Sequence, residues 1–115
     1  MPGVDLTAVR QLALALPQVT EEPHFEMTSW RVHKRLFATA PPDGDRLHVF
    51  VDEDEVRASV AEDPAAFEEL WWGKRLSGLR VNLAAADPAR VEELLTEAWL
   101  RKAPKRLAAE FWASR

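Results

Sequence analysis

Three short segments with alternating apolar and polar side chains follow one another with only turn signals between them. They cover residues 30–33, 36–40 and 46–51. Alternation with a period of two predicts strands. The connections at Lys34-Arg35 and at residues 41–45 are too short to hold a crossover helix, and strands joined in this way pair antiparallel. This stretch therefore restricts the chain to folds built on an antiparallel sheet.

Asp5 and Asp87 mark the expected starts of two helices, because a side-chain oxygen at this position caps free backbone N–H groups. Another helix is expected to start at the acidic residues 52–55, because negative charge is favourable at the N-terminal end of the helix dipole. Pro17 is expected to end the first helix. Apolar residues follow at helical spacing. They are Leu6, Val9, Leu12, Ala13 and Leu16; then Val56 and Val60; then Val91, Leu94, Leu95, Ala98 and Trp99.

The third helix is expected to run from residue 88 to about residue 102, with Pro88 at its first position. Its other face, with Arg90, Glu93 and Glu97, is expected to be solvated. Pro104 interrupts the helical pattern, and the apolar residues between 107 and 112 predict a short helical tail.

The remaining segments are assigned from shorter patterns. Asp63-Pro64 predicts a short helix through Phe67 and Leu70. Strands are expected at residues 72–76 and 79–83, with Ser77-Gly78 as their turn, while residues 20–26 are acidic and irregular. The expected fold is α+β, a two-layer sandwich in one domain spanning residues 1–115. Its five-stranded antiparallel sheet has helices on one face, in the order αβββαββα plus a C-terminal helical tail.

Composition excludes several classes of protein. The chain has no cysteine, which excludes disulfides, zinc–thiolate sites and thiol nucleophiles and favours a cytoplasmic location. Its apolar runs are too short to span a bilayer, and the N-terminus lacks the pattern of a signal peptide, so no membrane association is expected. The net charge of −4 argues against indiscriminate coating of nucleic acid, although a local basic face is compatible with it.

No residue pattern proposes an enzyme. His24, His33 and His48 lack partners at metal-ligand spacing, apart from the weak alternation of Glu22, His24 and Glu26. The four serines sit in no glycine-framed turn, and the four glycines form no phosphate-binding loop. We therefore expect a protein without catalytic residues, without a bound metal and without a cofactor.

The predicted sheet carries cations on the face away from the helices. Alternation sends to this face Arg31, His33, Arg46, His48, Phe50, Arg80 and Asn82, with Lys34 and Arg35 at the neighbouring turn. A cationic face with an aromatic ring can contact phosphates and stack a base. The alternative is that these are ordinary exposed strand positions, where arginine is common.

A second basic cluster comprises Arg101-Lys102 and Lys105-Arg106, on either side of Pro104. Cations in the last turn of a helix offset its dipole, which accounts for the first pair better than for the second. The five tryptophans are expected in the core, with Trp72 or Trp112 as the alternatives for an exposed partner contact.

An ordered set of short motifs resembles the MmcQ/YjbR family over most of the chain. The matching pieces are Leu14-Ala15-Leu16-Pro17, Glu22-Pro23-His24-Phe25, Trp30-Arg31-Val32, Arg35-Leu36-Phe37-Ala38, Val81-Asn82-Leu83, Ala98-Trp99 and Ala103-Pro104-Lys105-Arg106-Leu107. Lys34 and Glu26 stand where the family often has glycine, and Leu79 stands where it often has an aromatic residue.

The resemblance implies an αβββαββα, frataxin-like fold and a double-wing protein that binds DNA. It places basic contacts at Arg31 and Arg35 in the hairpin and at Lys105 and Arg106 near the C-terminus. With the cations of the sheet, the candidate nucleic-acid-binding residues are Arg31, Lys34, Arg35, Arg46, Arg80, Lys105 and Arg106.

Two alternatives remain from the sequence. A protein-interaction or chaperone-like module would use the exposed sheet face or the tryptophans. A ligand-binding or metal-binding protein of frataxin-like architecture would use an acidic ridge formed by Glu21, Glu22 and residues 52–55. The expected partners are therefore DNA or another protein.

Overall fold

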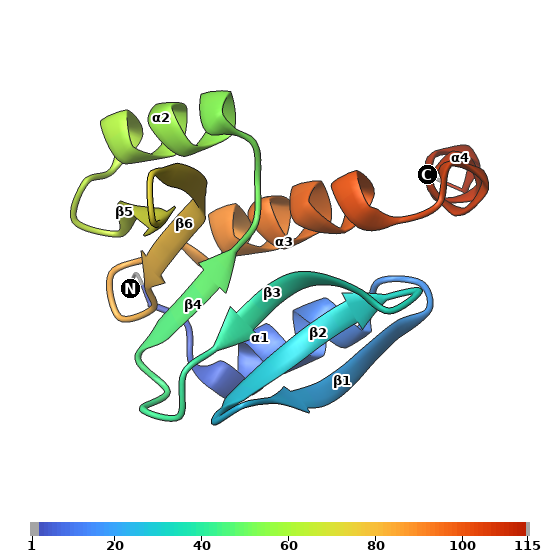
Figure 1. Ribbon diagram of the computed structural model, residues 1–115, viewed down its shortest axis with the longest axis horizontal. Coiled ribbons are helices and arrows are strands. Elements are labelled where there is room, and N and C mark those ends of the chain that lie inside the picture. The colour runs from blue at the N-terminus through green and yellow to red at the C-terminus, as the bar shows by residue number, and fades with distance from the viewer. Residues whose placement is uncertain (1–2, 115) are drawn as a thin grey trace.

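The computed structural model describes residues 3–114, which form four helices and one six-stranded sheet (Figure 1). The elements are α1 (Leu6–Leu14), β1 (Val19–His24), β2 (Met27–Val32), β3 (Arg35–Ala40), β4 (Arg46–Val49), α2 (Glu53–Glu62), β5 (Phe67–Trp72), β6 (Arg75–Asn82), α3 (Pro88–Lys102) and α4 (Lys105–Ala113). The strands lie in the order β1-β2-β3-β4-β6-β5, and every neighbouring pair is antiparallel. The α+β class and the antiparallel sheet are thus confirmed.

The predicted starts of α1, α2 and α3 are confirmed, and each of these helices begins after an aspartate cap. The Asp5 carboxylate accepts a hydrogen bond from the backbone N–H of Ala8 at 2.8 Å, and Asp52 accepts one from Glu55 at 2.8 Å. Asp87 accepts one from Ala89 at 3.0 Å, with Pro88 in the first turn of α3. Each cap satisfies a backbone donor that the helix itself cannot pair.

Helices α1 and α3 cover one face of the sheet, behind the strands in Figure 1. The core between these layers contains Val9, Ala13, Trp30, Val32, Ala38, Leu47, Val49, Leu79, Val81, Val91, Leu95 and Trp99, all at most 1% exposed. Within residues 3–114 no helix crosses the opposite face, which is turned toward the viewer in Figure 1. That open face is where side chains of the sheet can meet a ligand.

The sheet has six strands because most of residues 20–26, expected to be irregular, belong to the edge strand β1. It pairs with β2 from Val19 opposite Val32 to His24 opposite Met27. Four consecutive residues of β1 are exposed, so the strand shows no alternation of apolar and polar side chains. Only pairing with β2 makes this segment a strand, and the sequence pattern could not reveal it.

The prediction of a short helix after Asp63-Pro64 is also wrong. Residues from Phe67 onward form β5, which pairs with β6 from Phe67 opposite Val81 to Trp72 opposite Arg75. The reversal lies at residues 73–74, where Gly73 has a φ of 61°, rather than at residues 77–78. Phe67 and Leu70 are spaced as in a helix, but pairing with β6 overrides that local preference.

The β2–β3 turn is shifted by one residue from the expected position. It is formed by His33 and Lys34, with φ values of 48° and 69°. Two left-handed residues in succession are typical of a type I′ turn, which matches the twist of a hairpin. A bulge follows: Trp30 lies opposite Ala38 but Arg31 lies opposite Leu36, which leaves Phe37 between them.

Two expectations about exposure are corrected. Arg90 is not solvated: its side chain is 17% exposed and contacts α2, donating to Ser59 Oγ at 2.8 Å and to Glu55 Oε1 at 3.3 Å.

Only Trp30 and Trp99 of the five tryptophans are core residues. Trp71, Trp72 and Trp112 are exposed, because β5 and α4 lie at the margins of the fold and have no further layer to cover them.

Candidate functional site

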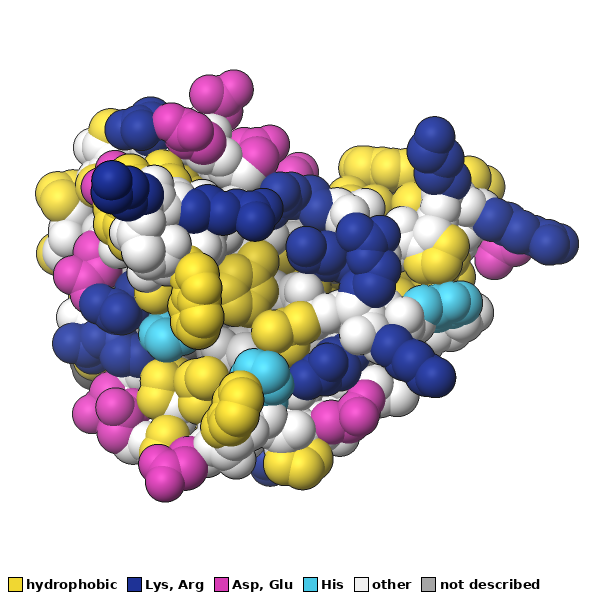
Figure 2. Space-filling view, in the orientation of Figure 1, with side chains coloured by type: hydrophobic (Ala, Val, Ile, Leu, Met, Phe, Trp, Pro, Cys, Tyr) yellow, Lys and Arg dark blue, Asp and Glu magenta, His cyan; other side chains and the backbone are white. Residues whose placement is uncertain are grey.

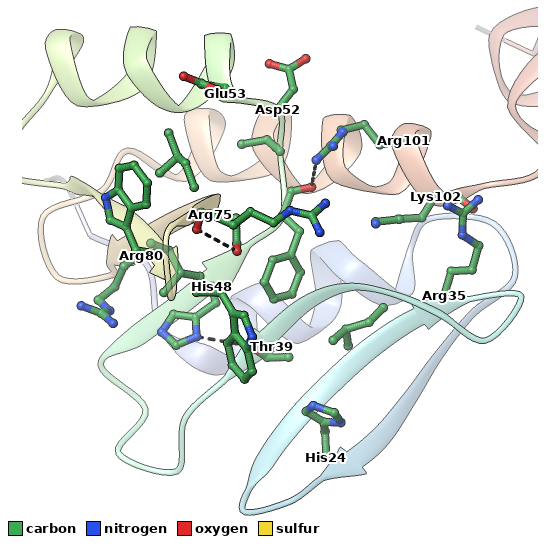
Figure 3. Close-up of a pocket in the computed structure, with 18 of the residues that line it drawn as sticks. His24, Arg35, Thr39, His48, Asp52, Glu53, Arg75, Arg80, Arg101 and Lys102 are labelled. Atoms are coloured by element: carbon green, nitrogen blue, oxygen red, sulfur yellow. Dashed lines mark hydrogen bonds between the residues drawn. The ribbon is translucent and has the colours of Figure 1, made fainter.

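A hollow of about 830 Å³ lies on the open face of the sheet. Strands β3, β4 and β6 form its floor, and it is bordered by the β5–β6 hairpin, the start of α2 and the C-terminal end of α3 (Figure 3). In the space-filling view, hydrophobic side chains occupy the middle of this face, and lysine and arginine side chains gather around them (Figure 2). The volume falls within the range of small-molecule sites.

The polar part of the floor comes from three neighbouring strands. Thr39 on β3 lies opposite His48 on β4, and His48 lies opposite Arg80 on β6. Thr39 Oγ1 and His48 Nδ1 are 3.4 Å apart. Burial lowers the pKa of His48, and the nearby Arg80 lowers it further, while Asp43 acts in the opposite direction. A neutral imidazole has one donor and one acceptor nitrogen, and in His48 the Nδ1 atom is the one that faces Thr39.

The apolar part of the hollow is formed by aliphatic and aromatic side chains. Leu36 comes from β3, Leu70 from β5 and Leu76 from β6. Phe50 follows β4 directly, and its backbone N–H donates to the Phe37 carbonyl at 3.1 Å, which holds this residue beside β3. Trp72, at the end of β5, is 82% exposed at the margin of the hollow. Such flat rings can accept a planar ligand face.

Four cations converge along the side of the hollow nearest α3, and we call them the cationic cluster: Arg35, Arg75, Arg101 and Lys102 (Figure 3). Arg35 begins β3, Arg75 begins β6, and the other two end α3. Two of them are fixed by backbone carbonyls. Arg101 Nη1 donates to the Phe50 carbonyl at 2.8 Å, and Arg35 Nη1 donates to the Lys102 carbonyl at 3.3 Å.

The charges of the cationic cluster are not neutralised by the protein. Burial lowers the pKa of Lys102, and the positive charges of Arg101, Arg35 and Arg75 each lower it further. Within residues 3–114, none of the four has a carboxylate within 4.0 Å. Mutual repulsion without compensation is unfavourable for folding and is relieved by a bound anion.

Two carboxylates border the hollow but are engaged elsewhere. Asp52 caps α2 through the Glu55 N–H, and Glu53 accepts a hydrogen bond from Arg57 Nη2 at 2.7 Å. They therefore leave the cationic cluster unpaired while setting a negative boundary on the α2 side of the hollow. The hollow is consequently polarised, with cations along α3 and the β5–β6 turn and acids beside α2.

The structure brings together some of the residues singled out from the sequence. Arg35 and Arg80 line the hollow, although Arg80 also contacts Glu68 at 3.4 Å. Arg31 contacts His24 at 3.1 Å, and Arg46 lies beside Asn82 over a separate small depression.

The other three candidates lie outside the hollow. Lys34 is in the β2–β3 turn, and Lys105 and Arg106 begin α4, where Arg106 pairs with Glu110 at 3.7 Å. In the sequence, Lys34 directly precedes Arg35, and Lys105 and Arg106 follow Lys102 after Ala103 and Pro104.

Sequence reasoning missed Arg75 and assigned Arg101 and Lys102 mainly to the helix dipole. Arg75 was expected inside a strand ending at the wrong turn, so its side chain had no predicted neighbour. The signal that could have revealed the site is the absence of acidic residues near positions 101–106 combined with the exposed pair Trp71-Trp72. Neither signal identifies Arg35 and Arg75 as neighbours, because only the fold brings them to α3.

Among residues 3–114, no three histidine, aspartate or glutamate side chains are grouped so that they could hold a metal ion. Glu22 and His24 lie on β1 and Glu26 lies in the turn after it.

Within residues 3–114, no helix is both long enough and apolar enough to cross a bilayer.

The fold is that of a small α+β protein with one open sheet face, and a cation-bordered hollow lies on that face. Comparison with known proteins makes this specific: the chain belongs to the YjbR family, whose model matches residues 14–101. The family resemblance found in the sequence is therefore confirmed.

Two mycobacterial relatives align with this chain over nearly the full length of both sequences. Uncharacterized protein Rv2570 of Mycobacterium tuberculosis and uncharacterized protein Mb2600 of Mycobacterium bovis are each 30% identical over 125 aligned positions, covering 92% of this chain and 94% of theirs. The crystal structure of Deinococcus radiodurans protein DR2400, with a DUF419 domain, superposes with a TM-score of 0.78 at 19% identity, over 97% of this chain and 91% of that one. The last comparison shows a shared fold.

Proposed function

We propose that this protein is a non-enzymatic, cytoplasmic DNA-binding protein whose main contact is the cationic cluster. The observation that carries the proposal is the convergence of Arg35, Arg75, Arg101 and Lys102, without acidic partners, beside an aromatic hollow. Arg101 and Arg35 are already held by backbone carbonyls, so little side-chain freedom is lost when they meet a phosphate. Lys34, Lys105 and Arg106 supply outer phosphate contacts.

Binding of this kind is weak and strongly dependent on salt. The chain carries a net charge of −4, so attraction to a polyanion comes from the cationic cluster and its neighbours while the remaining surface repels phosphate. Four phosphate contacts correspond to a slope of log K against log salt of about −3 to −4. A dissociation constant on the order of 10⁻⁴ to 10⁻⁶ M at physiological salt follows for contacts that are mainly to phosphate.

The experiment is a fluorescence-anisotropy titration of a labelled oligonucleotide at several salt concentrations. The R75A/K102A variant removes two members of the cationic cluster, and it should roughly halve the slope. K105A/R106A matches this charge change outside the hollow and should reduce the slope by less. Equal reductions in both variants, or a flat salt response in the wild type, would contradict the proposal.

Exposed aromatic residues favour one second candidate, a protein partner on the same face. Phe25, at the β1–β2 turn, is 91% exposed and packs against the His24 ring at 4.9 Å, and Trp72 is also exposed. Aromatic side chains of this kind are enriched at protein interfaces. Failure of every nucleic acid to bind at low salt would favour this candidate, which would then be tested by loss of a captured partner in the Trp72→Ala variant.

A further inference from the structure

We infer that the hollow receives an unpaired base, so that the ligand is single-stranded DNA rather than duplex. This inference rests on the proposed function and adds the form of the nucleic acid to it. It is carried by the position of the cationic cluster next to an apolar concavity, since phosphate attraction alone would require only a flat basic surface.

The walls of the hollow are suited to the face of a base. Phe50, Leu70 and Leu76 line its apolar part, and Trp72 stands at its margin with most of its ring exposed. In a duplex, base faces are covered by their stacked neighbours, and a protein reaches only base edges and the sugar–phosphate backbone. A base can cover these apolar side chains only if it is unpaired or extruded from the helix.

The polar groups of the floor are suited to the edge of the same base. The Thr39 hydroxyl and the His48 ring lie side by side on β3 and β4, deeper in the hollow than the exposed Trp72. Thr39 itself is buried and lies within hydrogen-bond distance of His48 Nδ1, so the Nε2 atom of the His48 ring is the polar group of this pair left for a ligand. A base edge that reaches the floor can therefore meet the His48 ring.

One contact connects the two parts of the site. The Arg101 guanidinium donates to the backbone carbonyl of Phe50, whose side chain lines the hollow. A cation for a phosphate and a ring for the adjoining base are thereby fixed at neighbouring positions. Asp52 and Glu53 lie on the α2 side of the hollow, so a strand that presents its phosphates to the cationic cluster avoids these acids.

The test compares four ligands with the intact chain under one salt condition: a labelled oligothymidylate, a duplex of equal length, an abasic oligonucleotide with the same number of phosphates, and a thymidine mononucleotide. We expect the oligothymidylate to bind about 10-fold or more tightly than the duplex and the abasic strand. The mononucleotide should bind more weakly than the oligomer, because it makes fewer phosphate contacts.

Trp72→Ala is the principal variant, and Trp112→Ala is its matched control. Both side chains are exposed, but Trp112 lies on α4 away from the hollow. Trp72→Ala should weaken oligothymidylate binding about 10-fold and leave abasic-strand binding unchanged, while Trp112→Ala should change neither. Phe50→Leu, checked for folding by denaturation, provides a second variant of the hollow with the same expected direction.

The outcomes separate this inference from the proposed function. Equal or tighter binding of the duplex, or equal binding of the abasic strand, would overturn the unpaired-base inference while the phosphate contacts of the proposed function stand. A mononucleotide that binds as tightly as the oligomer would instead indicate a small-nucleotide site and overturn it as well. Absence of binding to all four ligands at low salt would overturn both.

Discussion

The indole nitrogen of Trp99 donates a hydrogen bond to the backbone carbonyl of Pro17 at 3.0 Å, across 82 positions of sequence. Trp99 lies on α3 and Pro17 lies in the segment between α1 and β1, so this bond joins α3 to the connection that follows α1. The ring itself is fully buried, and Phe111 of α4 packs against it at a centroid distance of 5.0 Å. One side chain of α3 thus contacts both the α1–β1 connection and α4.

Trp99→Phe is expected to lower the free energy of unfolding by about 2–4 kcal/mol. The substitution leaves the Pro17 carbonyl without its donor and opens a small cavity in the core. Glu93→Ala, on the exposed side of the same helix, should change it by at most about 0.5 kcal/mol. Urea denaturation of the three proteins measures both values, and similar losses in the two variants would show that this face of α3 is not the core face.

Gly78→Ala is expected to destabilise the sheet by about 1–3 kcal/mol or more. A β-carbon at Gly78 would overlap the Val49 carbonyl oxygen and lie 3.0 Å from the Phe50 α-carbon, so β4 and β6 would have to separate. Gly73→Ala is the matched control: no atom lies within 4 Å of the added carbon, and only the φ of 61° opposes it. Its cost should be about 1 kcal/mol. The ranking is read from thermal unfolding midpoints, and the reverse order would refute the close approach.

Lys34→Gly is expected to stabilise the protein by about 0.5–1 kcal/mol. Lys34 has a φ of 69°, which a residue with a β-carbon adopts at a cost, while glycine adopts it freely. The gain is partly offset by the greater flexibility of glycine in the unfolded chain. Chemical denaturation measures the difference. Lys34→Ala serves as the control for loss of charge and should give no such gain, so equal effects of the two substitutions would contradict the backbone explanation.

His48→Gln is expected to make the protein less sensitive to acid. The pKa of His48 is lowered from its ordinary value of 6.5, first by burial and then by Arg80, with Asp43 opposing. Well above pH 6.5 the ring is neutral in both the folded and the unfolded state, so it does not make the free energy of unfolding depend on pH. As the pH falls through 6.5 toward the lower folded pKa, the unfolded state binds the proton first, so stability is lost.

The measurement is the free energy of unfolding at about pH 7.5 and about pH 5, for the wild type and the His48→Gln variant. The variant should lose less stability between these two conditions. An equal or larger loss in the variant would show that protonation of His48 carries no penalty in the folded state.

The sequence by itself determined the elements whose signals are local. The caps at Asp5, Asp52 and Asp87 act within one helical turn, and the alternation at residues 46–49 records which face of β4 is buried. The stripe of Val91, Leu95 and Trp99 likewise defines the core face of α3. These patterns are readable because each of these elements has one buried face, and burial imposes the period of the element on its side chains.

Tertiary structure alone decided the two edge strands and the candidate site. Four of the six residues of β1 and three of the six of β5 are exposed, neither strand alternates, and only pairing with β2 and β6 makes them strands. The cationic cluster draws on positions 35, 75, 101 and 102, which belong to β3, β6 and α3. Their proximity depends on strand order and on where α3 ends over the sheet, and both are set by long-range packing that no local sequence period records.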